Sequence, residues 1–230
     1  MNEEKPIREV LSEVFYDNPM IFRNLFDFNF LPASYIHPSR RNLFFDKVID
    51  ESIWFQRKTW PRLSRQILKS QNLEDKFSFT ICFPGSAYLL LPLPKFRNLA
   101  LHIGAIMIGS SIRSSLGRED VLQWKHELGN EVFEFVMNRG TLLPDAHIST
   151  STNRMSDIER LGGSLILSGL DELSEAIKKR ALLKFHIDSR NLEIDRKAAK
   201  NLTNSVLFLL EREWHSLFSE MKSKVNSISR

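Results

Sequence analysis

The run LALHIGAIMIG, residues 99–109, constrains the fold more than any other segment. Wound into a helix, it presents apolar side chains on nearly every side, so the helix has to be buried all round. A bilayer crossing needs roughly 18 to 20 apolar residues, and this run is much shorter. We therefore predict a soluble protein with a central buried helix over Phe96–Leu116, capped by Gly117. Gly104 and Ala105 would let a neighbouring helix approach it closely.

Hydrophobic periodicity predicts further helices on both sides of this one. Pro61 suits the first turn of one of them, because a proline there leaves no extra N–H unpaired. Ser156 and Glu159 have the spacing of a capping box at the start of another. The predicted ranges are 7–16, 20–26, 43–56, 61–70, 118–138 ended by Gly140, 156–180 with a break near Gly169, and 197–222.

Only short segments have the character of strands. Phe77–Phe83 is predicted as a strand or extended segment, and Lys184–Ile187 pairs with Leu192–Ile194 as a hairpin across a turn of Asp, Ser, Arg and Asn. Asp145–Arg154 is predicted to be a loop. The expected fold class is mainly α, a single-domain irregular helical bundle with a small β-hairpin or short strands.

Composition excludes several classes of protein. The single cysteine, Cys82, forbids an internal disulfide and any cysteine-based zinc cluster, which fits a reducing cytosol. The first residues lack the basic start and apolar run of a secretory signal. A net charge of +4 is mildly basic, so it permits an acidic partner without demanding one.

The segment Phe28–Pro38, which we call the proline-bounded segment, is too irregular for a helix or a strand. Its two prolines, Pro32 and Pro38, fix their own φ angles and push the preceding residues towards extended geometry. Aromatic side chains stand towards both ends of it. We expect a stiff, compact connector whose rings dock on a core.

Taken as Phe30-x-Pro32-Ala33-x-Tyr35-x-His37, this segment resembles the N-terminal signature of the SctK/YscK family. The resemblance continues through the central apolar helix, the helix that ends near Pro144, and three later segments. These are Asp157–Glu159, Leu182–Ile187 and the helix through Trp214 and Phe218. The resemblance implies a family domain over residues 24–225, preceded by an N-terminal extension of residues 1–23.

Three segments match part of a catalytic or ligand-binding motif, but each lacks a residue that the motif requires. Asn130 stands where a zinc-protease helix that starts at His126 and Glu127 needs its second histidine. Ser110 replaces the lysine that a phosphate-binding loop would need after its second glycine. The run from Gly162 lacks the final glycine and the preceding strand of a nucleophile elbow. We expect no enzyme activity, no metal, no cofactor and no small-molecule substrate.

The basic residues are more informative than the acidic ones. Residues 52–73 contain no Asp or Glu and several cations beside Trp54 and Trp60. At 100° per residue the cations of the predicted helix lie opposite Leu63 and Ile67. The simpler interpretation is a helix with its tryptophan inward and its cations in water. The functional interpretation is an acidic protein partner docking on the cationic face, which we define as Arg57, Lys58, Arg62, Arg65 and Lys69. A second basic group, Lys178–Arg180 with Lys184, is expected to favour a helix C-terminus.

The family resemblance implies a non-enzymatic adaptor in the sorting platform of a bacterial type III secretion system. Its expected partners are the cytosolic forkhead-associated-like domain of the inner-membrane ring protein and the SctQ-like spoke protein. The expected location is the cytoplasm, peripherally at the inner-membrane face of the apparatus, with no nucleic acid bound and no membrane insertion. The alternative is a helical protein-binding regulator or chaperone-like module unrelated to secretion. Pro32, Tyr35 and His37 carry the resemblance and are expected to be structural.

Overall fold

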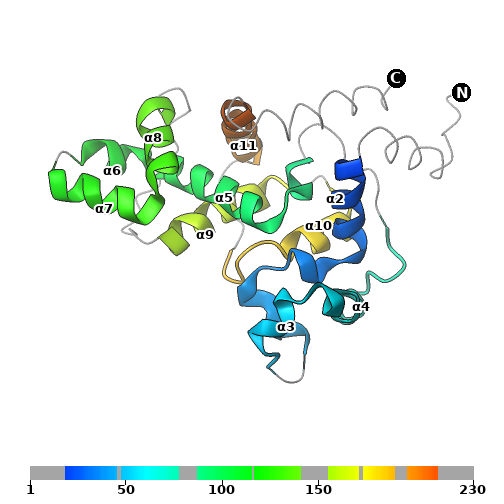
Figure 1. The fold of residues 1–230 in the computed structure, drawn as a ribbon. Coiled ribbons are helices and arrows are strands. Elements are labelled where there is room, and N and C mark those ends of the chain that lie inside the picture. Colours follow the sequence, from blue (N-terminus) through cyan, green and yellow to red (C-terminus); the bar gives the residue numbers. More distant parts are fainter. Residues whose placement is uncertain are drawn as a thin grey trace, which may run out of the picture. The chain divides into compact units, whose positions relative to one another are not determined.

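The computed structural model describes residues 19–45, 48–77, 87–115, 117–140, 155–170, 173–189 and 196–211. Within these ranges every regular element is an α-helix or a 3₁₀ helix, so the mainly α class is confirmed (Figure 1). The chain forms two compact units. Unit 1 takes residues 1–93, 175–184 and 214–230, and unit 2 takes residues 94–174 and 185–213. The single domain predicted over 24–225 stays a prediction.

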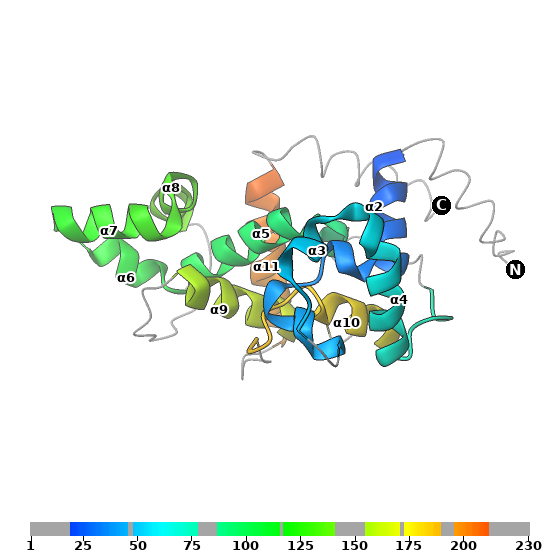
Figure 2. The same ribbon diagram turned by 60° about the horizontal axis from the view of Figure 1, so that its bottom comes forward.

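Unit 1 is built from short helices around the proline-bounded segment. Both views place α4 close to α2 and α10 (Figures 1 and 2). Its elements are α2 (Pro19–Phe30), η1 (Pro32–Ser34), η2 (Pro38–Phe44), α3 (Glu51–Phe55), η3 (Arg57–Thr59), α4 (Trp60–Ser70), η5 (Ala87–Leu90) and α10 (Glu175–Leu182). Helix α4 packs on η1 and α2, and α2 also packs on η5. The buried side chains between them include Leu25, Phe28, Tyr35, Trp54, Ile67, Leu89 and Ile177.

Unit 2 is organised around the predicted central helix. Its elements are α5 (Leu93–Met107), α6 (Gly109–Ser114), α7 (Arg118–Leu128), α8 (Asn130–Arg139), α9 (Met155–Ser168) and α11 (Arg196–Glu211). Every residue from Leu99 to Gly109 is buried, as the apolar run predicts. Helices α6, α7 and α8 gather at the C-terminal end of α5, and α11 packs on α9 (Figures 1 and 2).

Helices α5 and α9 cross without side chains between their backbones. A Cβ built on Gly104 would lie 1.9 Å from the carbonyl oxygen of Ile158, and one built on Gly162 would lie 1.8 Å from that of Ala100. Backbone atoms cannot move aside as a side chain can. The predicted close approach at Gly104 is therefore confirmed, and glycine is required on both helices.

Two predicted long helices are broken. The helix expected over Phe96–Leu116 ends at Met107, because Ile108 has φ −101° and ψ 12°, and restarts at Gly109. Gly117 does not cap it but precedes α7, with φ −70°. The helix expected over Arg118–Asn138 is interrupted at Gly129, whose φ of +78° suits glycine and stops α7. Gly140 follows the last turn of α8 as predicted.

Other boundaries also differ from the prediction. The helix expected over 43–56 is wrong: Leu43 and Phe44 end η2, and α3 starts only at Glu51, where the Asp50 carboxylate accepts the N–H of Ser52 at 2.7 Å. Ser156 lies inside α9, which has already begun at Met155. The break near Gly169 is confirmed, because α9 ends at Ser168 and α10 begins at Glu175.

The first strand of the predicted hairpin is wrong. Lys184–Ile187 lies in turns, because the Lys184 N–H donates to the carbonyl of Ala181 and the Ser189 N–H to that of His186. Several predictions lie outside the described residues: the helix 7–16, most of the strand 77–83, the loop 145–154, the strand 192–194 and the end of helix 197–222. Among the described helices, none combines the length and apolar content needed to span a bilayer.

Replacing Gly104 by alanine is expected to destabilise the protein by at least about 2 kcal/mol, because the added methyl group collides with the backbone of α9. The measurement is the free energy of unfolding in urea. Gly163→Ala is the matched control on α9: its Cβ would meet only side-chain atoms of Phe185 and Ser189, each at 3.3 Å. This control should change stability by less than about 1 kcal/mol. Equal losses in the two variants would contradict the backbone crossing.

Candidate functional site

The proline-bounded segment ties the elements of unit 1 together through buried hydrogen bonds. The Tyr35 hydroxyl donates to the carbonyl of Phe28 at 2.8 Å, and the two rings stack with centroids 5.6 Å apart. The N–H of Ala33 donates to the Ser64 hydroxyl of α4 at 3.1 Å. The N–H of His37 donates to the carbonyl of Leu183 at 2.7 Å, just after α10.

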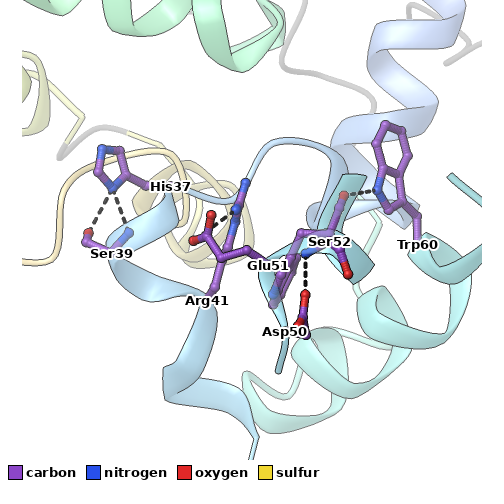
Figure 3. A network of polar contacts seen from close by, with 8 residues as sticks. His37, Ser39, Arg41, Asp50, Glu51, Ser52 and Trp60 are labelled. Atoms are coloured by element: carbon purple, nitrogen blue, oxygen red, sulfur yellow. Dashed lines mark hydrogen bonds and ion pairs between the residues drawn. The ribbon is translucent and has the colours of Figure 1, made fainter. Parts of the chain in front are cut away.

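The imidazole ring of His37 caps the N-terminus of η2. Its Nδ1 accepts the N–H of Ser39 at 3.2 Å and lies 2.8 Å from the hydroxyl of the same residue (Figure 3). Pro32, Tyr35 and His37 are all buried. The signature residues are therefore structural, as expected, and the segment fixes α4 in place.

The second basic group predicted from the sequence divides into two parts: Lys178 and Lys179 are half-buried, whereas the other two members lie inside unit 1. Arg180 is 0% exposed and Lys184 is 2% exposed. Arg180 donates to the carbonyls of Leu73 at 3.1 Å and Asn29 at 3.4 Å. Lys184 donates to the carbonyl of Leu91 at 2.5 Å. These cations therefore hold backbone carbonyls inside unit 1.

Burial changes the proton affinity of this region. It lowers the pKa of Lys184 to about 7, although the charge of Asp27 opposes the change. The ammonium lies 5.0 Å from the ring centroid of Tyr35 and 5.9 Å from that of Phe28. Burial also raises the pKa of Asp27, against the cations Arg23, Arg57 and Lys184, and it raises the pKa of Tyr35 and of Tyr88.

The residues 51–70, which we call the α3–α4 corner, are held together by local bonds. The indole N–H of Trp60 donates to the carbonyl of Trp54 at 2.8 Å (Figure 3). The Thr59 hydroxyl lies 2.7 Å from the carbonyl oxygens of Ile53 and of Gln56. These bonds join the end of α3 to the start of α4, so the corner is well ordered.

Arg41 reaches the corner from η2. Its guanidinium lies 5.2 Å from the ring centroid of Trp54 and 5.6 Å from that of Phe55. Its Nη1 lies 3.7 Å from the Glu51 carboxylate (Figure 3). Burial lowers the pKa of Arg41, and the Glu51 charge opposes that change. No sequence pattern predicts this contact, because Arg41 and Phe55 belong to different elements.

All five residues of the cationic face are exposed. On α4 the opposite side is buried through Leu63, Ser64, Ile67 and Leu68, so the predicted orientation of this helix is confirmed. The Arg57 guanidinium lies 5.9 Å from the Trp60 ring, which is half-buried. In the described ranges no carboxylate lies within ion-pair distance of the five cations. Their positive charge is thus available to a partner.

Three glutamates near the break between α7 and α8 belong to two different helices. Glu127 belongs to α7, whereas Glu131 and Glu134 belong to α8, beyond the break at Gly129. Glu159, which sequence analysis did not single out as a site, pairs through two oxygens with Arg97 at 2.7 and 2.8 Å within unit 2. That hydrogen-bonded pair raises the pKa of Arg97.

The described residues contain no cluster of three or more His, Cys, Asp or Glu side chains that would hold a metal ion. Cys82 lies outside them. A polar recess of about 230 Å³ lies between α6 and α7, where the Trp124 indole N–H donates to the Ser115 hydroxyl at 3.1 Å. Ser111, Asp120 and Gln123 complete its lining. Its single carboxylate, Asp120, is exposed and has no second acid or base beside it in the recess.

A family model described as "YOP proteins translocation protein K (YscK)" matches residues 24–204, which is most of the chain. The matched range includes the proline-bounded segment and the cationic face. No match was found among curated proteins or among solved structures.

The stability of unit 1 is expected to rise with pH between about 7 and about 10. In that window the folded protein carries a neutral Lys184, while the unfolded chain, with the ordinary lysine pKa of 10.5, still binds the proton. Folding must therefore release this proton, and the cost of releasing it falls as the pH rises towards 10.5. Above pH 10 the rise should stop, because folding raises the pKa of Tyr35 and Tyr88.

The measurement is urea unfolding at several pH values for the wild type and Lys184→Met. The substitution should flatten the rise. Lys178→Met is the control and should keep the wild-type profile, because Lys178 lies on α10 just before Lys184 but is only half-buried. A profile unchanged by Lys184→Met would show that another group titrates.

Proposed function

The chain belongs to the SctK/YscK family of type III secretion proteins, and on this premise we propose that it is a non-enzymatic adaptor of the sorting platform. In this role it links the cytosolic domain of the inner-membrane ring protein to the SctQ-like spoke protein. It acts in the cytoplasm, held peripherally at the inner-membrane face of the apparatus through these partners.

The observation that carries the proposal is the cationic face on an ordered support. Five exposed cations without a carboxylate among the described residues would bind an acidic protein surface through charge. The α3–α4 corner is already held by the Trp60 and Thr59 bonds, so a partner has little of this surface left to order. One of the two partners docks here.

The division of the chain into two compact units also fits an adaptor. An adaptor needs at least two binding surfaces, and each of two compact units can carry one. The cationic face lies wholly in unit 1, which leaves unit 2 to the other partner. The buried polar groups described above mostly bind backbone carbonyls or each other, which is a structural use.

Reversing two charges, as in Arg62→Glu with Arg65→Glu, is expected to weaken binding of one partner at least tenfold, about 1.4 kcal/mol, and more at low salt. Both side chains point into solvent, so the thermal midpoint should not change. The measurement is isothermal titration with the purified ring-protein domain and the purified spoke protein.

The matched control reverses two exposed cations of unit 2, Arg118→Glu and Lys197→Glu, for the same change in net charge. Each lies in the first turn of its helix, where a negative charge is favourable. An equal loss of partner binding in the control would show that the effect comes from net charge and not from the cationic face. Unchanged binding of both partners by the Arg62 and Arg65 variant would refute docking on the cationic face.

A further inference from the structure

Phe55 is exposed in a way that its neighbour is not. The last residue of α3 leaves 71% of its surface in water, whereas Trp54, one position earlier, is 3% exposed. Single exposed apolar residues are common on protein surfaces and need no function. Phe55 differs because its ring contacts Arg41 and lies beside Arg57 and Lys58, which have no carboxylate at ion-pair distance among the described residues.

The support of the ring is Arg41. The guanidinium lies over Phe55 at 5.6 Å while it also contacts Trp54 and pairs with Glu51. The Arg41 side chain is only 13% exposed, so the cation that contacts the ring is itself largely buried. An aromatic ring fixed before binding loses little side-chain entropy when a partner covers it.

The cations next to the ring make one side of the site positively charged. Phe55, Gln56, Arg57 and Lys58 form an unbroken exposed stretch of chain, and the Thr59 and Trp60 bonds fix its far end. The nearest acids in the sequence, Asp50 and Glu51, lie at the other end of α3. A partner that covers the ring therefore meets positive charge on the side of Arg57 and Lys58.

We propose that Phe55 is the apolar anchor of the cationic face and fills an apolar pocket on an acidic protein, with carboxylates at the pocket rim pairing with Arg57 and Lys58. This proposal rests on the proposed function and adds the residue that supplies most of the affinity. Aromatic residues in fully covered pockets dominate many interfaces, while charges at the rim mainly set association rate and partner choice.

Two other occupants fit the observations less well. A second copy of the chain would carry a net charge of +4 towards this positive surface. A single-stranded nucleic acid is bound by stacking bases on several open rings, but one side of Phe55 is already covered by Arg41. An acidic protein with a pocket uses both the free part of the ring and the cations.

The test is isothermal titration of Phe55→Ala and Phe55→Glu with the same two purified proteins, over a range of salt concentrations. Phe55→Ala should weaken binding of one partner about 30-fold, the size of an interface hot spot, and by the same factor at every salt concentration. Arg57→Glu with Lys58→Glu should weaken binding of that same partner mainly at low salt. Phe55→Glu should abolish binding of that partner, because it adds repulsion.

Leu122→Ala is the matched control, since Leu122 is a 56% exposed apolar residue on α7 of unit 2. It should leave binding of the partner that recognises Phe55 unchanged. The thermal midpoint of both Phe55 variants should equal that of the wild type, because the ring is exposed. A fall of several degrees in both would assign Phe55 a structural role and overturn the proposal.

The remaining outcomes separate the anchor from the proposed function. If Phe55→Ala binds like the wild type while the Arg62 and Arg65 reversal weakens binding, the anchor is wrong and the cationic face stands. If neither purified protein binds the wild type, both proposals fail. If Phe55→Ala instead changes the sedimentation of the protein alone, or abolishes binding to a single-stranded oligonucleotide, the occupant is a second copy or a nucleic acid, and the proposal is overturned.

Discussion

The position of α4 on the proline-bounded segment is the constraint on which the candidate site depends. The buried bond from the Ala33 N–H to the Ser64 hydroxyl fixes the rotation of α4 about its axis, with Ile67 and Leu68 directed inward. Because cations and apolar residues alternate with the helical period, this rotation directs Arg62 and Arg65 outward. The family signature thus has a physical role at a distance: it orients a surface to which its own side chains do not contribute.

Unit 1 uses its basic residues in two ways. Arg180 donates hydrogen bonds to the carbonyl of Asn29, in the last turn of α2, and to the carbonyl of Leu73, which follows α4. The carbonyls in the last turn of a helix have no partner within the helix. Burying a cation costs free energy unless its N–H groups are hydrogen-bonded, and these carbonyls accept those hydrogen bonds. Basic residues do favour carbonyl ends, as the sequence indicates, but Arg180 binds the end of α2, and in its own helix it donates to Ala176 of the first turn at 3.4 Å. The five cations of the cationic face, in contrast, lie in water.

Periodicity predicted the elements whose environment is set by their own residues. Helix α4, the burial of α5 and the break at Gly169 follow from local patterns. The break at Gly129 had a signal, a glycine followed by Asn130, which the strong stripe of apolar residues outweighed. The burial of Arg180 also had one, since it shares a face of α10 with Ile177 and Ala181, whereas Lys184 lies beyond the end of that helix. The break at Ile108 also had one, Gly109 followed by Ser110 and Ser111, which the long apolar run before it outweighed.

The contact of Arg41 with Phe55 could not be predicted from the sequence. Adjacent aromatics in a short helix, Trp54 and Phe55, have equal hydrophobicity, and only the packing of η2 against α3 decides which one is buried. That decision also determines the candidate site, because it leaves one ordered ring next to Arg57 and Lys58. Charge alone gives long-range attraction that salt weakens, and an apolar anchor alone gives little discrimination between partners. A surface with both can select an acidic partner and then hold it, which is what an adaptor requires.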